Sequence, residues 1–141
     1  MPSKSKVCFF FETRGFALAD RTRLKRFIES IFKKEKKDLS FINFIFCSDK
    51  YLLQINKKYL NHDFYTDIVT FGLTSEGSIE AEVYISVDRV RENAKTLGIS
   101  FKSELERVIF HGALHLCGYK DKTQKEIAEI RRKEDHYLSL Y

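Results

Sequence analysis

The chain has 141 residues, of which 43% are hydrophobic and 14% aromatic, and it contains one proline and six glycines. This size and composition are typical of one globular domain rich in regular elements and exclude a disordered chain. Lysine and arginine number 25 against 20 for aspartate and glutamate, a formal net charge of +5, which weakly favours a polyanionic partner such as nucleic acid.

The cysteines and the apolar runs indicate the compartment. Cys8, Cys47 and Cys117 are far apart and form no CxxC motif, which argues against a disulfide framework and fits a reducing environment. The sequence has no run of about 18 apolar residues for a membrane span, and the apolar run over residues 7–11 is shorter than most signal-peptide cores of roughly 7–15 residues. We therefore expect a cytoplasmic protein without membrane association.

The first half of the chain predicts two strands, each followed by a helix. Asp20 is expected to cap the first helix, which ends in a lysine-rich stretch that suits a helix C-terminus. Ser48 or Asp49 is expected to cap the second helix. The predicted elements are a strand over 7–11, a helix from Asp20 into 33–38, a buried strand over 39–47 and a helix to about Lys58.

The second half predicts a polar, aromatic loop, two strands and three helices. These are the loop 59–67, the strands 68–73 and 80–87, and helices over 88–97, from Ser103 to about Cys117, and from Thr123 onward. Gly98 is expected to close the first of these helices. Ser103 with Glu106, and Thr123 with Glu126, match the S/T-x-x-E capping box. This order predicts one α/β or α+β domain over residues 1–141, with a central mixed sheet of about four strands covered by helices.

The stretch HGALHLCGYKD begins at His111 and places two histidines four positions apart on a predicted helix. Side chains at i and i+4 share one helix face, with Cβ atoms about 5–6 Å apart, so His111 and His115 can reach one ion. Gly118 can take the left-handed conformation that ends a helix, and Asp121 can then return a carboxylate. Two nitrogens, one oxygen and an open fourth position are typical of catalytic zinc. The alternative is a helix end that happens to hold two histidines.

The same stretch helps to decide which reaction a metal ion at this site would catalyse. Its spacing matches the ligands of the metzincin pattern HExxHxxGxxH, with aspartate for the third histidine. Gly112 stands where a metalloprotease carries its general-base glutamate, so proteolysis is disfavoured. Cys117 lies about 200° around the helix from His115 and is expected to be a buried small hydrophobe. An ion-bound water and nearby lysines suit phosphodiester cleavage instead.

The stretch from His111 resembles the signature H-G-x-L-H-L-x-G-Y-D-H of the YbeY family, which are bacterial metal-dependent endoribonucleases of ribosomal RNA maturation. INKKYLNHDFYTDIVTF over 55–71 is similar to a second family stretch, L-N-x-x-Y-R-x-x-D-x-x-T-D-V-L-S-F, and AEVYIS over 81–86 resembles G-D-I-x-I-S. The resemblance extends over about residues 49–137. This sequence departs from it at Asp121, where the family has histidine, and at Leu60, where the family has an arginine thought to contact substrate or phosphate.

The resemblance implies an α/β domain with one divalent ion, expected to be Zn²⁺, held at the end of a helix by His111, His115 and Asp121. The carboxylate ligand softens the preference for zinc over other divalent ions. Water at the fourth position would attack phosphorus or take the proton of a ribose 2′-OH, and the sequence does not choose between these. Substrate contacts are expected from Lys58, His62, Lys120 and Lys122.

We therefore expect a cytoplasmic, single-strand endoribonuclease that matures small-subunit ribosomal RNA, serves ribosome quality control, and has RNA and the ribosome as partners. One alternative is a ribosome-associated assembly factor whose metal is structural, with little or no catalysis. Another is a metal hydrolase for a substrate other than RNA, for which steep salt dependence of RNA binding is not expected.

Overall fold

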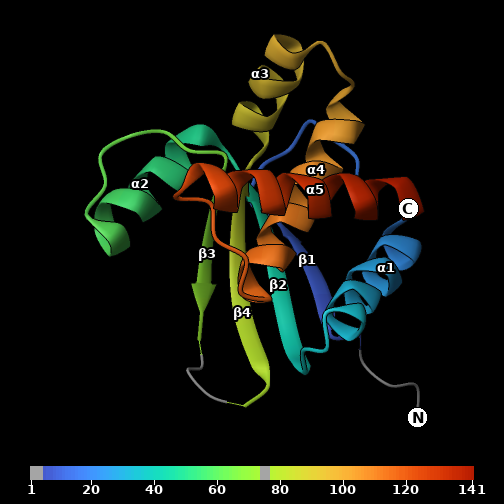
Figure 1. Ribbon diagram of the computed structural model, residues 1–141. Helices are drawn as coiled ribbons and strands as arrows, with labels where there is room; N and C mark the ends of the chain where they lie inside the picture. The colour runs from blue at the N-terminus through green and yellow to red at the C-terminus, as the bar shows by residue number, and fades with distance from the viewer. Residues whose placement is uncertain (1–4, 74–76) are drawn as a thin grey trace.

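The computed structural model describes residues 5–73 and 77–141 (Figure 1). The described elements are β1 (Val7–Phe11), α1 (Arg21–Lys34), β2 (Leu39–Cys47), α2 (Asp49–Leu60), β3 (Ile68–Gly72), β4 (Ile79–Ser86), α3 (Val87–Leu97), α4 (Phe101–Leu116) and α5 (Gln124–Leu140). They form one four-stranded mixed sheet with helices packed on it, which confirms the predicted fold class. Within these ranges no helix is both long and apolar enough to cross a membrane.

The sheet has the order β1-β2-β4-β3. β2 is parallel to both β1 and β4, whereas β3 is antiparallel to β4. Phe44 of β2 pairs with Phe9 of β1 and with Val83 of β4, and both Phe44 and Val83 are fully buried. Strands that are buried on both faces carry nearly continuous apolar runs, which explains the dense apolar sequence of β2.

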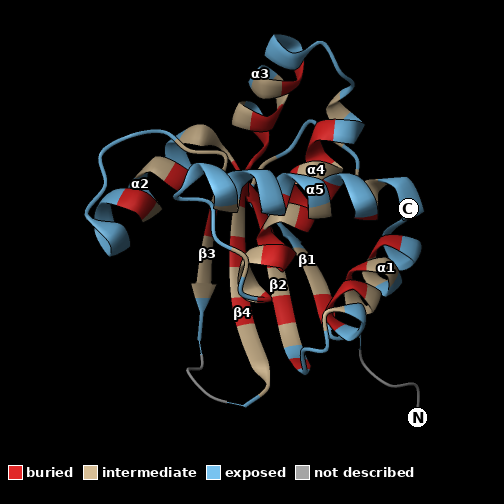
Figure 2. Ribbon diagram, in the orientation of Figure 1, coloured by how far each residue is buried: buried red, intermediate tan, exposed pale blue. Residues whose placement is uncertain are grey.

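The helices lie on both faces of the sheet but cover them unequally. One face carries the main core, to which α1, α4 and α5 all contribute, and α5 runs across α4 (Figure 1). The other face has a small second core beneath α2, built on Cys47, Leu52 and Val69. Figure 2 shows buried residues along the strands and on α4, which contacts β3, β4, α1, α3 and α5. α4 is therefore held on several sides, and it is the helix that carries both histidines.

The first helix ends within the predicted lysine-rich stretch 33–38. α1 ends at Lys34, and Lys36 takes a positive φ of 59° before β2 begins. The prediction that Asp20 caps this helix with its side chain is wrong. Asp20 precedes α1 but lies in the left-handed region, so its backbone carbonyl accepts from Leu24 while its side chain makes no capping hydrogen bond.

The start of α4 was predicted one turn too late. Ser100 is the N-cap, and its side chain accepts a hydrogen bond from the backbone N–H of Ser103. Ser103 therefore lies inside the first turn, where Phe101 packs edge-on against Phe16 and extends the helix toward its N-terminus. The second capping box is confirmed, because the Thr123 side chain caps α5 and Glu126 bonds back to it.

Candidate metal centre

Gly112 allows α4 to pack closely on the sheet. A Cβ at this position would lie 2.9 Å from Cδ1 of Ile68 and 3.2 Å from Cγ1 of Val83, which is closer than real Cβ contacts allow without movement of a neighbour. The absence of a side chain thus lets the helix approach β3 and β4. A glutamate here would press against the side chains of Ile68 and Val83, so close packing on the sheet disfavours the general base of the HExxH motif at this position.

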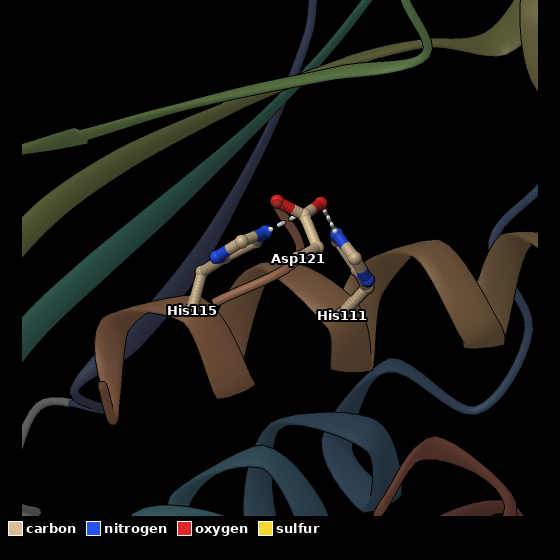
Figure 3. Close-up of side chains that lie close together, drawn as sticks. All are labelled: His111, His115 and Asp121. Atoms are coloured by element: carbon tan, nitrogen blue, oxygen red, sulfur yellow. Dashed lines mark hydrogen bonds and ion pairs between the residues drawn. The ribbon is translucent and has the colours of Figure 1, made fainter. Parts of the chain in front are cut away.

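Three side chains meet beside α4. Nitrogen atoms of His111 and His115 and a carboxylate oxygen of Asp121 lie within 4.8 Å of one another. Oδ2 of Asp121 is 3.4 Å from Nε2 of His111 and 3.2 Å from Nε2 of His115 (Figure 3). The two imidazole rings are nearly perpendicular. Two imidazole nitrogens and one carboxylate oxygen are donors that divalent zinc accepts, so this group can hold a metal ion.

The turn after α4 brings the aspartate back to the histidines. Gly118 has a φ of +107°, and its N–H donates to the carbonyl of His115 over 3.0 Å. The N–H of Tyr119 reaches back to the carbonyl of Leu114 over 3.1 Å. These bonds satisfy free carbonyls at the helix end, as a glycine-containing C-cap does. The predicted role of Gly118 in reversing the chain is confirmed.

Tyr119 anchors this turn to distant helices. Its hydroxyl donates to Oε1 of Glu35 over 2.7 Å. The other carboxylate oxygen accepts from the hydroxyl of Tyr137 and from Nζ of Lys133, the latter over 3.3 Å. Burial raises the pKa of Glu35, but the hydrogen bonds from these three side chains outweigh it, and the pKa lies below its usual value. The turn that carries Asp121 is therefore tied to both α1 and α5.

The second nitrogen of His111 contacts a buried acid that the sequence analysis missed. Nδ1 of His111 lies 2.6 Å from Oε2 of Glu134, whose side chain is 3% exposed. Burial lowers the pKa of His111, yet the hydrogen bond and the charge of Glu134 raise it overall. The sequence did contain a signal. Glu134 lies four residues after Ile130 and three before Tyr137, on the apolar face of α5, where a glutamate needs a buried partner.

A cavity of about 290 Å³ opens beside His111, between α3, α4 and α5. Its polar lining includes Asp67, Asn93, Arg107 and Glu134. Nδ2 of Asn93 donates to Oδ2 of Asp67 over 3.2 Å. Burial raises the pKa of Asp67, and the charge of His111 opposes that rise only in part. A partly buried carboxyl with a shifted pKa in a cavity is typical of a functional site, and the sequence analysis gave Asp67 no role.

The predicted substrate-contacting residues lie on two exposed segments. Lys58 lies in the last turn of α2, with its ammonium 5.3 Å from the ring centroid of Tyr59, and His62 stacks on Phe64 in the loop that follows the helix. Lys120 and Lys122 lie on either side of Asp121, and both are exposed. The three-residue group includes neither His62 nor Cys117.

Cys117 follows α4 and is the rival sulfur ligand that the sequence raised. Its side chain is buried at 7% exposure, as predicted. Burial, with a smaller contribution from the charge of Glu35, raises the pKa of its thiol to about 12. Because the thiolate is the form that binds metal, the structure gives Cys117 the properties of a core residue.

Comparison with known proteins gives one consistent result. The family model described as Endoribonuclease YbeY matches residues 12–141. Endoribonuclease YbeY of Cytophaga hutchinsonii is 48% identical over 97% of this chain and 97% of its own length, and that of Christiangramia forsetii is 43% identical over 94% and 92%. The solution structure of TM1509 from Thermotoga maritima is 31% identical, covers 92% of this chain and 86% of its own, and superposes with a TM-score of 0.66.

Proposed function

The chain belongs to the YbeY family of endoribonucleases, which acts in ribosomal RNA processing, and from this premise we propose a zinc-dependent enzyme that works on the ribosome in the cytoplasm. The convergence of His111, His115 and Asp121 within 4.8 Å carries the metal dependence. The family and the net charge of +5 support an RNA substrate. The assembly-factor alternative is not favoured, because the chain matches the endoribonuclease family over nearly its full length.

We propose that the two histidines of α4 and Asp121 are the zinc ligands. A bound Zn²⁺ polarises phosphoryl oxygens and lowers the pKa of water to near 7. The protein contributes the arrangement of the donors: α4 fixes the spacing of the two imidazoles, and the turn at Gly118 sets the carboxylate opposite them. Replacement of the family's third histidine by Asp121 keeps a competent donor, because zinc accepts carboxylate oxygen.

Residues outside the metal centre would bind the RNA and transfer protons during cleavage. Lys120 and Lys122 lie next to Asp121 and can contact backbone phosphates, and we assign Lys58 and His62 to a more distant part of the strand. Asp67 is fixed by Asn93 and lines the same cavity as His111. We assign the carboxylate of Asp67 to the proton transfer that a nucleophile requires.

The test is cleavage of single-stranded ribosomal RNA by metal-free protein reconstituted with Zn²⁺, Mn²⁺ or Mg²⁺. We expect cleavage only with an ion present and highest with zinc. Asp67→Asn should bind zinc and RNA as the native protein does but cleave slowly. Full cleavage by chelator-treated protein would contradict metal dependence, and zinc binding without cleavage would support the assembly factor. RNA affinity should fall with salt by a logarithmic slope of about 0.7 per phosphate contact.

A further inference from the structure

We propose that Glu134 is a positioning residue for the metal centre: through Nδ1 of His111 it fixes the imidazole so that Nε2 faces the other two donors. In this way it sets how tightly the centre binds a divalent ion. The proposal rests on the proposed function, because it requires His111 to be a ligand.

The two nitrogens of His111 face different partners. Nδ1 lies 2.6 Å from Oε2 of Glu134, and Nε2 lies 3.4 Å from Oδ2 of Asp121. A neutral imidazole carries one proton, so donation from Nδ1 to a carboxylate leaves the lone pair on Nε2 free for a metal. A carboxylate on the outer nitrogen of a ligating histidine orients the ring and increases its basicity.

Glu134 is itself held in place. Its carboxylate divides its contacts, since Oε2 faces His111 and Oε1 lies 3.2 Å from Nη1 of Arg107. Arg107 is bound in turn by Asp135 at 3.4 Å and by Glu104 at 3.6 Å. A buried acid without partners is strongly unfavourable, and here both oxygens have one. The carboxylate therefore has little freedom to follow a different orientation of the imidazole.

The two histidines are not equivalent. Among the described contacts, His115 has a hydrogen-bond partner only at Nε2, which faces Asp121. His111 has a partner at each nitrogen, and one of these is a buried carboxylate. Among the described contacts, only His111 therefore has its outer nitrogen, the one that faces away from Asp121, bound by a protein group. Glu134 thus acts on this one ligand, and we expect the orientation of the His111 ring to be more tightly fixed than that of His115.

The experiment measures zinc affinity by competition with a chromophoric chelator for the native protein and two variants. Glu134→Gln should weaken zinc binding roughly 10–100-fold, the range typical of outer partners of metal ligands. Asp135→Asn is the matched control, because Asp135 is the next residue, also contacts Arg107, and is exposed. It should bind zinc within about twofold of the native protein.

A second readout reports on the ring itself. In zinc-loaded protein labelled with ¹⁵N-histidine, NMR should show His111 protonated at Nδ1 and metal-bound at Nε2. This measurement needs only the native protein, so it decides the proposal even if Glu134→Gln does not fold. Metal bound at Nδ1 of His111, or a folded Glu134→Gln with native zinc affinity, would overturn the proposal while leaving the proposed function intact. A native protein that binds no divalent ion would overturn both.

Discussion

His111 contacts a buried carboxylate of α5, whereas residues 59–65, which end α2 and begin the loop that leads to β3, are all exposed. We call Arg107, His111 and Glu134 the buried side of the site, and residues 59–65 the open side. On the buried side, Glu134 lies 2.6 Å from His111 and 3.2 Å from Arg107. The open side presents the aromatic rings of Tyr59, Phe64 and Tyr65 to solvent, although the backbone of Phe64 is tied to the buried amide of Asn56.

The difference between the two sides is explained by the ligand that each would bind, a metal ion on the buried side and RNA on the open side. A small ion needs donors fixed to within fractions of an ångström, and buried partners supply that precision. A long RNA strand is held by many weaker contacts, among them base stacking on aromatic rings and phosphate contacts with lysine. Changes on the buried side should therefore abolish or greatly reduce function, and changes on the open side should tune affinity.

The largest effect is expected from His115→Ala. Loss of a ligand should weaken zinc binding by more than the roughly 10–100-fold that an outer partner contributes, and RNA cleavage should fall with it. Metal content and cleavage rate measured on the same samples provide the check. His136→Ala, on exposed α5 surface, is the control, and equal losses in both variants would contradict the ligand assignment.

A large effect on stability is expected from Gly112→Glu, which creates the HExxH sequence of proteases. The new side chain must displace Ile68 and Val83 and bury a charge, so the free energy of unfolding should fall by about 3 kcal/mol or more. Denaturant unfolding measures this loss. A variant of native stability would show that α4 does not pack as closely on the sheet as the structure has it.

A moderate effect is expected from Tyr119→Phe, which removes the hydrogen bond to Glu35. The loss should be about 1 kcal/mol of stability at neutral pH. Because the pKa of Glu35 is lower in the folded protein than its usual value, its contribution is complete above that usual value and disappears as pH falls through the lowered pKa. Unfolding measured from pH 7 to pH 3 should therefore show the gap between native and variant narrowing in acid. A constant gap would contradict the ionised state of Glu35.

The smallest effect is expected on the open side, from Leu60→Arg. Leu60 is exposed, and arginine here restores the residue that the family resemblance expects. RNA binding should tighten, and its logarithmic salt dependence should steepen by about 0.7 for one added phosphate contact. Leu60→Gln is the uncharged control. An unchanged slope for the arginine variant would place the RNA elsewhere than on residues 59–65.

The local parts of this site could be predicted from the sequence. The spacing of His111 and His115, the reversal at Gly118 and the return of Asp121 depend on neighbouring residues and on helix geometry, which sequence reports directly. Glu134 and Glu35 were missed because their partners lie 23 and 84 residues away, at His111 and Tyr119. Contacts of that kind leave no periodic pattern, apart from the presence of a charged residue on an apolar helix face.

Helix boundaries show the same limit on a smaller scale. Ser100 and Ser103 are both suitable N-caps, and sequence favoured the one that is followed by a glutamate three residues later. The packing of Phe101 against Phe16, a residue of the segment before α1, selected the other. The helix start observed is thus the one that brings Phe101 into a tertiary contact, which local sequence does not report.

The most direct test of the central claim, that His111, His115 and Asp121 together hold zinc, is X-ray absorption at the zinc edge of the loaded protein. We predict a first shell of nitrogen and oxygen only, at about 2.0–2.2 Å, with imidazole scattering from two histidines. In Asp121→Ala the shell should lose one protein ligand and keep both imidazoles. A sulfur scatterer near 2.3 Å would mean that Cys117 binds the ion, and would contradict the assignment of this centre.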